Sequence, residues 1–388
     1  MQTTQGRRRA GRAVQTLYRR SPHVVCYWRG TTFVFFNYAV AMHAPAHELT
    51  CQILNFFDRW RPVSELIRHL GGRLPAGDIH ALVEALTNRA LLERSDRPVP
   101  ESATAMRSWE PWNPAAGFFH GMTRDVQYID PAAGRRLLRR QARRSPAPRA
   151  VKHYKDAAIV DLPLPAIDGE FCDVLLARRT CRRFGAGRVS FSALATVLGL
   201  TAGVQHWREL PGLGEVALKT YPSGGARHSL EFYVLSRRID GLPPGLYHYA
   251  SDRHVLERLP FKSRMPRVQE YLPRQRWFEP AAALVFLTAV FERVQWRYKF
   301  ARAYRAVLTE AGHACQNFCL VATRLRLAPF CTMALADTRI ERDLGLDGLS
   351  ESVIYAAGFG LPTESGPGWL VPGQHTRRVR PNPALTRR

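Results

Sequence analysis

The longest apolar run of the chain, AAALVFLTAVF at 281–291, constrains the fold more than any other segment. A membrane-spanning helix needs about 20 apolar residues, so this run is about half the required length. It contains no charged residue, which predicts a strand buried inside a soluble domain. We therefore expect a globular core built around this strand.

The region around this strand, 166–375, has the dense and regular pattern of an α+β domain. No internal repeat is visible in it. Periodicity predicts helices over 169–178, 192–202 and 296–327, and strands over 230–237, 246–249, 255–259, 282–291 and 352–357.

A second, smaller domain is predicted over 21–97. Two β-rich runs, 24–28 and 32–37, are separated by Arg29-Gly30, which indicates a hairpin. Amphipathic helices are expected at 48–60, at 63–70 and from Asp78 to Arg89. A hairpin with three short helices is typical of a winged-helix-like domain. We expect a disordered tail at 1–20, a Pro- and Arg-rich connection at 98–165 and a basic tail at 376–388.

The chain has a formal net charge of +24, from 56 Lys+Arg and 32 Asp+Glu. Only five of the basic residues are lysines, and many arginines lie in the two tails and in 135–149. This pattern fits arginine-rich coding bias with solvated tails, or an anionic partner. The predicted helix Asp78–Arg89 also contains Glu84 and has few basic residues, so we do not expect it to read a DNA groove.

The seven cysteines are widely spread and form no CxxC motif. Cys315 and Cys319 lie one helical turn apart without a matching ligand pair, so no metal site is expected. An odd number of scattered cysteines predicts reduced thiols in the cytoplasm. No apolar run follows the Arg-rich N-terminus, so neither a secretory signal nor a membrane partner is expected.

Three segments carry residues suited to ligand chemistry. In the first, Arg178, Thr180 and Arg182 alternate, so an extended backbone would point two guanidiniums and a hydroxyl the same way, as a phosphate monoester requires. In the second, Pro222-Ser223-Gly224-Gly225 precedes a strand, and its glycines let backbone amides approach a flat ligand. Chance clustering of arginines and an ordinary loop are the alternative interpretations.

The third segment is the predicted helix after Tyr298 and Lys299. Its polar residues recur at helical spacing through His313 and Gln316. A functional face and a partly solvated helix with a satisfied histidine both fit this pattern.

Taken in order, these segments resemble the nitroreductase superfamily, specifically its SagB/ThcOx-type branch of flavin-dependent azoline dehydrogenases. The resemblance spans about 165–362, with a lead-in at 113–125. It is carried by RRTCRRF (178–184), YPSGGARHSLEFYV (221–234), GLPPGLYHY (241–249), HVLERL (254–259), LTAVFERV (287–294), AYRAVLTEAGHACQNFCLVATRLRL (303–327), LGL (344–346) and GFGLP (358–362).

The resemblance implies an α+β sandwich that binds FMN at the interface of a homodimer. It implies that Arg178, Thr180 and Arg182 hold the FMN phosphate and ribityl chain. Pro222, Ser223, Gly224 and Gly225 would line the isoalloxazine through backbone contacts. Arg377 or Arg378 would add a late phosphate contact.

The implied reaction oxidises an azoline in a ribosomally made peptide to an azole, with hydride passing to flavin N5 and O2 reoxidising the flavin. The family's Lys-Tyr dipeptide is replaced here by Tyr298-Lys299, which are the candidate bases. The N-terminal domain resembles a leader-peptide recognition fold, and a cyclodehydratase is a candidate partner. The alternatives are a flavin-dependent NAD(P)H nitroreductase or dehydrogenase for a small molecule, and an inert scaffold that binds peptide or nucleic acid.

Overall fold

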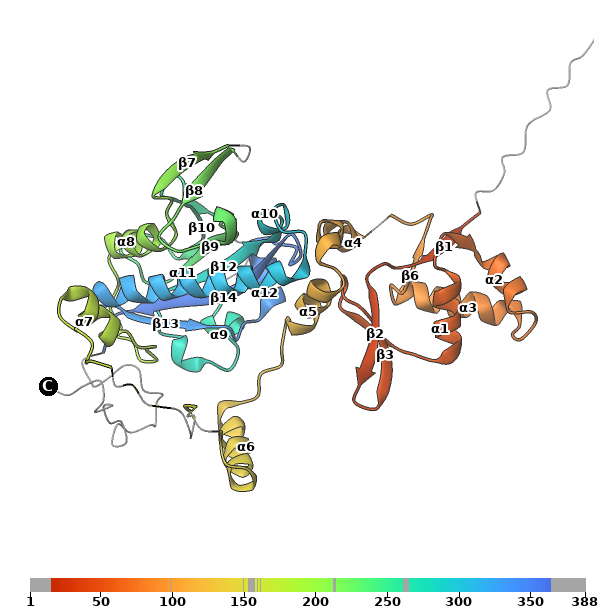
Figure 1. Ribbon diagram of the computed structural model, residues 1–388, viewed down its shortest axis with the longest axis horizontal. Helices are drawn as coiled ribbons and strands as arrows, with labels where there is room; N and C mark the ends of the chain where they lie inside the picture. The colour runs from red at the N-terminus through yellow and green to blue at the C-terminus, as the bar shows by residue number, and fades with distance from the viewer. Residues whose placement is uncertain are drawn as a thin grey trace, which may run out of the picture. The chain divides into compact units, whose positions relative to one another are not determined.

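The computed structural model describes residues 15–98, 100–148, 150–152, 158, 160, 162–211, 214–260 and 265–363. The chain divides into two compact units, Met1–Thr123 and Arg124–Arg388 (Figure 1). Arg377 and Arg378 lie outside the described residues. Among the helices that are described, none is both long and apolar enough to cross a bilayer.

The first unit contains two small antiparallel sheets, with strand orders β5-β1-β6 and β2-β3-β4. Its strands are β1 (Leu17–Arg20), β2 (Val24–Arg29), β3 (Thr32–Asn37), β4 (Met42–Pro45), β5 (Arg61–Pro62) and β6 (Leu92–Arg94). Its helices are α1 (Glu48–Phe56), α2 (Val63–His69), α3 (Ala76–Asn88), α4 (Glu101–Ala105), η1 (Met106–Trp112) and α5 (Ala115–Thr123).

The predicted hairpin and the three helices that follow it are confirmed. Gly30 turns the hairpin with a φ of +62°, which a side chain would disfavour. The helices bury their apolar faces against the sheets, and Phe57 and Leu66 are fully buried. The disordered tail predicted for residues 1–20 is wrong for its last four residues. Leu17–Arg20 form the central strand of a sheet because Tyr18 packs into this core.

The second unit is built on a six-stranded antiparallel sheet of order β11-β10-β9-β12-β14-β13. These strands are β9 (Leu230–Ser236), β10 (Gly245–Ala250), β11 (Val255–Arg258), β12 (Ala283–Val290), β13 (Ala328–Thr332) and β14 (Glu351–Gly360). The apolar run that predicted a buried strand is β12, near the middle of this sheet. Its side chains from Ala283 to Ala289 are all fully buried, so both faces of the sheet are covered here.

Helices and a hairpin complete the second unit. Leu284 and Phe286 pack with Tyr271 and Ile340, whereas Phe318 stacks on Phe359. The elements are α6 (Pro131–Arg144), α7 (Glu170–Ala177), α8 (Phe191–Ala202), α9 (Val268–Tyr271), α10 (Phe291–Gln295), α11 (Tyr304–Arg324) and α12 (Asp337–Leu344), with η2 (Gly224–Ala226), η3 (Arg276–Phe278), η4 (Ala301–Ala303) and the hairpin strands β7 (His206–Leu210) and β8 (Gly214–Leu218).

The predicted strands of the second unit are confirmed, each within a few residues of its expected bounds. The single helix expected over 296–327 is instead the short η4 followed by α11, and a separate helix, α10, ends at Gln295 just before it. The region 98–165, expected only as a connection, contains α4, η1, α5 and α6. The long helix α11 packs along β13, β14 and α8, and it organises the site described next.

Candidate functional site

The loop between β8 and β9 contains the predicted Pro222–Gly225 segment and has an unusual backbone. Gly225 has a φ of +65°, and Ala226 and His228 follow with φ values of +54° and +38°. These left-handed residues fold the loop back on itself, and Ala226 N donates to Ser223 O at 3.1 Å. The glycines at 224 and 225 are therefore the part of the loop whose main chain we expect to meet a ligand.

A buried carboxylate fixes this loop to α11. Glu310 Oε2 accepts hydrogen bonds from Ser223 Oγ at 2.7 Å and from Ser229 Oγ at 3.3 Å. Ser223 Oγ in turn accepts one from the backbone N–H of His228 at 2.9 Å. Burial raises the pKa of Glu310. Because the Ser223 hydroxyl is occupied inside the loop, the outward contacts of this segment fall to the backbone.

Residues 220–223 run along one flank of α11, antiparallel to the helix. Pro222 O lies 3.3 Å from His313 Nδ1, and Asn317 Nδ2 donates to Thr220 O at 3.2 Å. Of the polar face predicted for this helix, His313 contacts the loop, and the other contacts come from Glu310 and Asn317.

Tyr298 lies directly against the glycines of the loop. A Cβ placed on Gly225 would be 2.7 Å from Tyr298 Oη, and one on Gly224 would be 3.8 Å from Tyr298 Cε2. Arg297 covers the same place, with its Cδ 2.8 Å from that added Gly225 Cβ. Lys299, the other predicted base, is exposed. The structure thus brings Tyr298 and the loop together and leaves Lys299 at the surface.

We expect a Gly225→Ala substitution to affect this site more than a glycine replacement in open space. The alanine would be strained by about 1–2 kcal/mol in a left-handed backbone and would also displace Tyr298. Gly241→Ala is a matched control, because Gly241 has a φ of +70° and nothing within 4 Å of an added Cβ. Both variants should lose thermal stability, Gly225→Ala somewhat more, and only Gly225→Ala should lose affinity for the FMN that the family resemblance implies; equal FMN affinity in the two variants would contradict this role.

The predicted Arg178–Arg182 segment follows α7 and runs beside the edge strand β13. Cys181 N donates to Pro329 O at 2.7 Å, and Phe184 then packs on Phe330. Arg178, Thr180 and Arg182 are half-buried. Arg179 is exposed and donates to its own backbone, with Nη1 2.8 Å from both Leu176 O and Arg178 O. Arg179 therefore differs in exposure from Arg178 and Arg182, as the alternation in the sequence predicts.

The two predicted cofactor segments lie on opposite flanks of α11. At about 100° per residue, the contacts of the glycine loop at Glu310 and Asn317 fall on one flank of the helix. The guanidinium segment is joined to β13 by Cys181 N and Pro329 O, and Cys331 of that strand lies beside Cys319, which is about 180° from Glu310 around the helix. Within one chain, the helix therefore separates the guanidinium segment from the glycine loop.

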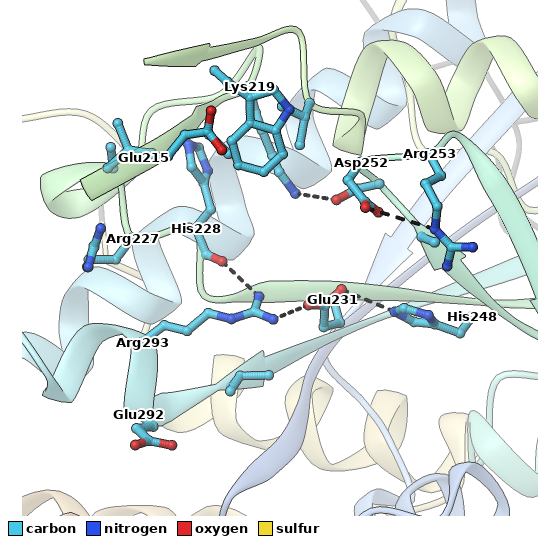
Figure 2. A pocket seen from close by; sticks show the side chains of 18 of the residues that line it. Glu215, Lys219, Arg227, His228, Glu231, His248, Asp252, Arg253, Glu292 and Arg293 are labelled. Carbon is cyan, nitrogen blue, oxygen red and sulfur yellow. Dashed lines mark hydrogen bonds and ion pairs between the residues drawn. The ribbon is translucent and has the colours of Figure 1, made fainter. Parts of the chain in front are cut away.

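A cavity of about 770 Å³ opens beside the loop, between the ends of β9, β10 and β11 and the β7–β8 hairpin (Figure 2). Charged side chains of both signs line it. They include Glu215, Lys219, Glu231, His248, Arg253 and Arg293.

Glu231 is the centre of the cavity's ion pairs. Its carboxylate pairs with Arg293 and lies 3.2 Å from His248 Nε2, and Arg293 also donates to His228 O at 3.1 Å (Figure 2). Burial alone would raise the pKa of Glu231, but hydrogen bonds from His248 and Arg293 lower it overall. The hydrogen bond to Glu231 raises the pKa of His248. Lys219 also lines the cavity and is not part of the ion pairs of Glu231.

Lys219 is a candidate functional residue that the sequence analysis did not select. Its Nζ points into the cavity and donates to Ser251 Oγ at 3.1 Å (Figure 2). Burial lowers the pKa of Lys219 to about 8. Burial of His228, together with the positive charge of Lys219, lowers the pKa of His228 to about 4. One signal was available, because Lys219 is one of only five lysines and precedes the loop by three residues.

We expect Lys219→Met to stabilise the protein at neutral pH. The folded-state pKa of about 8 lies below the ordinary 10.5, so the folded state binds fewer protons between these values. Wild-type stability attributable to Lys219 therefore rises with pH across that window, and below pH 8 the buried charge costs up to about 3 kcal/mol. Thermal unfolding at pH 7 and pH 10 should show the Met variant's advantage shrinking at the higher pH. The exposed-lysine control Lys299→Met should show neither effect, and an advantage for Lys219→Met that does not change with pH would contradict this account.

The structure adds a third cysteine to Cys315 and Cys319. Cys331 of β13 lies opposite them, and all three sulfurs are within 4.8 Å of one another. The sequence hides this group because the helix and the strand meet only in the folded chain. All seven cysteines are free thiols, as predicted, although only Cys315 and Cys319 are buried.

Comparison with known proteins gives a consistent family assignment. Residues 175–361 match the nitroreductase family. A protein assigned as a nitroreductase in Methanocaldococcus jannaschii is 30% identical over 186 residues, which cover 48% of this chain and 89% of that protein.

A second relative is the trifolitoxin-processing protein TfxB of Rhizobium leguminosarum bv. trifolii, which is 32% identical over 173 residues. The match covers 43% of this chain and 46% of TfxB, so the chain spans about half the length of that relative. Among solved structures, the E. coli microcin synthetase McbBCD complex with truncated pro-MccB17 matches with a TM-score of 0.39 and 19% identity, over 61% of this chain and 96% of that chain.

Proposed function

The chain belongs to the nitroreductase family of FMN-dependent oxidoreductases, and we propose that it oxidises an azoline in a ribosomally made peptide to an azole. The observation that carries the proposal is the glycine loop held on α11 with Tyr298 against Gly225. The class of substrate is supported by the 32% identity to a protein that processes trifolitoxin. We place the reaction in the cytoplasm, where seven free thiols stay reduced.

The residues present suit FMN. Arg178 and Arg182 offer guanidiniums for a phosphate, and the Thr180 hydroxyl lies between them in the sequence. At the other segment, a Cβ on Gly225 would collide with Tyr298, so only glycine lets Tyr298 lie this close to the loop where we place the planar ring. Pro222, Ser223 and Gly224 continue that surface.

The separation of these segments by α11 favours a homodimer. One chain holds its guanidinium segment and its glycine loop on opposite flanks of the same helix. A second copy related by a two-fold axis would bring the loop of one protomer to the guanidinium segment of its partner. Each flavin would then be held by both chains.

In the proposed reaction the protein must remove a proton from the azoline Cα and keep the ring oriented. FMN, when bound, supplies the hydride acceptor. Tyr298 Oη lies against Gly225, at the loop surface where we place the flavin ring. Its hydroxyl can therefore form a hydrogen bond to the azoline and help to orient it. Lys299 is the neighbouring base, and in one chain it is solvated. Closure of the site by a partner protomer would remove water from it.

The first unit provides a surface for the leader of the precursor peptide. β2 is an edge strand, and a groove of about 630 Å³ lies between it and α1. Val25, Phe35 and Leu54 line the groove, with Arg20 at its margin. An extended peptide that adds to β2 would satisfy its open backbone groups and lay side chains in the groove. A cyclodehydratase, which makes azolines, is the partner that must act first.

The experiment combines spectroscopy with substrate choice. The purified protein should carry FMN and oxidise an azoline-bearing peptide with O2, and removal of the leader should raise KM more than it lowers kcat. Rapid NAD(P)H oxidation without peptide turnover would instead favour a small-molecule nitroreductase. A protein that neither contains nor takes up FMN would be a binding scaffold.

A further inference from the structure

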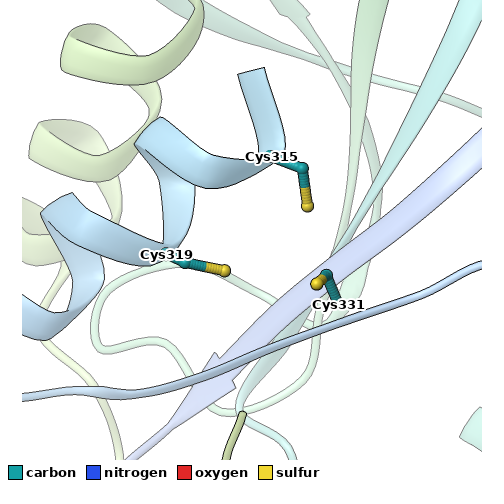
Figure 3. A group of neighbouring side chains, drawn as sticks. All are labelled: Cys315, Cys319 and Cys331. Atoms are coloured by element: carbon teal, nitrogen blue, oxygen red, sulfur yellow. The ribbon is translucent and has the colours of Figure 1, made fainter. Parts of the chain in front are cut away.

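Three cysteine side chains converge beneath α11, apart from the glycine loop. Cys315 and Cys319 extend from the helix and Cys331 from β13, and their sulfurs point toward a common centre (Figure 3). All three Sγ atoms lie within 4.8 Å of one another. The spacing of four residues puts Cys315 and Cys319 on the same face of the helix, opposite the strand.

The number and type of these side chains limit what the cluster can bind. Thiolates are soft ligands and select monovalent copper, zinc or iron–sulfur clusters. Structural zinc is almost always held by four ligands. Among the described residues, no fourth Cys, His, Asp or Glu joins the group. A site of three sulfurs therefore fits a three-coordinate monovalent ion better than zinc.

A hydroxyl and a guanidinium lie close to the cluster. Tyr355 Oη donates to Cys331 Sγ at 3.4 Å, and the positive charge of Arg178 acts on Cys319 and Cys331. Cys315 and Cys319 are buried, and Cys331 is half-buried.

We propose that Cys315, Cys319 and Cys331 form a binding site for one monovalent copper ion. Each sulfur that binds the ion releases its thiol proton to solvent, and no change in oxidation state is needed. The charge of Arg178 and the Tyr355 hydroxyl offset part of the negative charge that the thiolates bring. The site does not depend on the proposed peptide oxidation.

The test is a titration of the full-length protein, reduced and under anaerobic conditions, with Cu(I) buffered by a competing chelator. Wild-type protein should retain one copper per chain. Cys331→Ala should bind at least tenfold more weakly, and Cys315→Ala/Cys319→Ala should bind none. Cys172→Ala is the matched control, since Cys172 is a half-buried free thiol outside the cluster, and it should bind copper as wild type does. Thermal unfolding checks that each variant is folded.

Other results would overturn the proposal. Copper retained equally by wild type and Cys331→Ala would show adventitious binding. Zinc retained by reduced wild-type protein in place of copper would exclude the three-coordinate site. Failure of folded, reduced wild-type protein to retain either metal would show that the thiols serve only as core packing. A thiol assay that finds a disulfide within the cluster under reducing conditions would likewise contradict it.

Discussion

Replacing Arg178 and Arg182 together by alanine is expected to abolish FMN retention through purification. Each guanidinium–phosphate contact contributes about 1.5–3 kcal/mol, so loss of both should weaken FMN binding by at least about a hundredfold. Arg179→Ala should leave the affinity near that of wild type, because its guanidinium is turned back onto Leu176 O and Arg178 O. The measurement is a fluorescence titration of apoprotein with FMN.

The comparison with Arg179 separates a specific phosphate site from general positive charge. All three substitutions lie in one segment, and Arg179→Ala also removes one of the many basic charges of a +24 chain. If attraction by net charge held the flavin, the Arg179 variant would lose affinity in proportion, with the same salt dependence. Equal losses per arginine would therefore count against the assignment of Arg178 and Arg182.

A Tyr298→Phe/Lys299→Ala double variant is expected to lower kcat for azoline oxidation by about 10²–10⁴-fold while FMN affinity changes little. General acid–base catalysis contributes rate increases of this size. The single variants distinguish the two side chains. Tyr298→Phe keeps the ring against Gly224 and removes only the hydroxyl, whereas Lys299→Ala removes an exposed amine.

The single variants give the control for this prediction. If Lys299 is the base, Lys299→Ala should lose nearly as much kcat as the double variant, and Tyr298→Phe should keep most of the wild-type rate. A double variant with wild-type turnover would remove both residues from the reaction. Lys219, which is half-buried in the cavity and has a pKa of about 8, would then be the next base to test.

Much of the second unit follows from local sequence. The uncharged run 281–291 is the buried strand β12, and helical periodicity identified α7 and α8 closely. The missed elements have weaker signals. β13 is five residues long and contains Pro329, and α12 is predominantly polar because only one side of it packs in the core. Their structure depends on tertiary contacts that single-sequence patterns do not contain.

The candidate site was predictable in its parts and not in its arrangement. The glycines of the loop and the alternating arginines carry their chemistry in their residue types. Their positions on opposite flanks of α11 depend on how 220–229 and 178–184 cross that helix. The third thiol, Cys331, and the burial of Lys219 likewise arise only when separate elements pack together.

The central claim is that one flavin site is built from the guanidinium segment of one protomer and the glycine loop of its partner. Mixing subunits of Arg178→Ala/Arg182→Ala with subunits of Gly225→Ala, after unfolding and refolding together, tests it most directly. Random pairing would restore one complete site in each mixed dimer, or about a quarter of all sites. The account predicts recovery of about that fraction of bound FMN and activity. A mixture that stays as low as its two parents, although mixed dimers form, would contradict it.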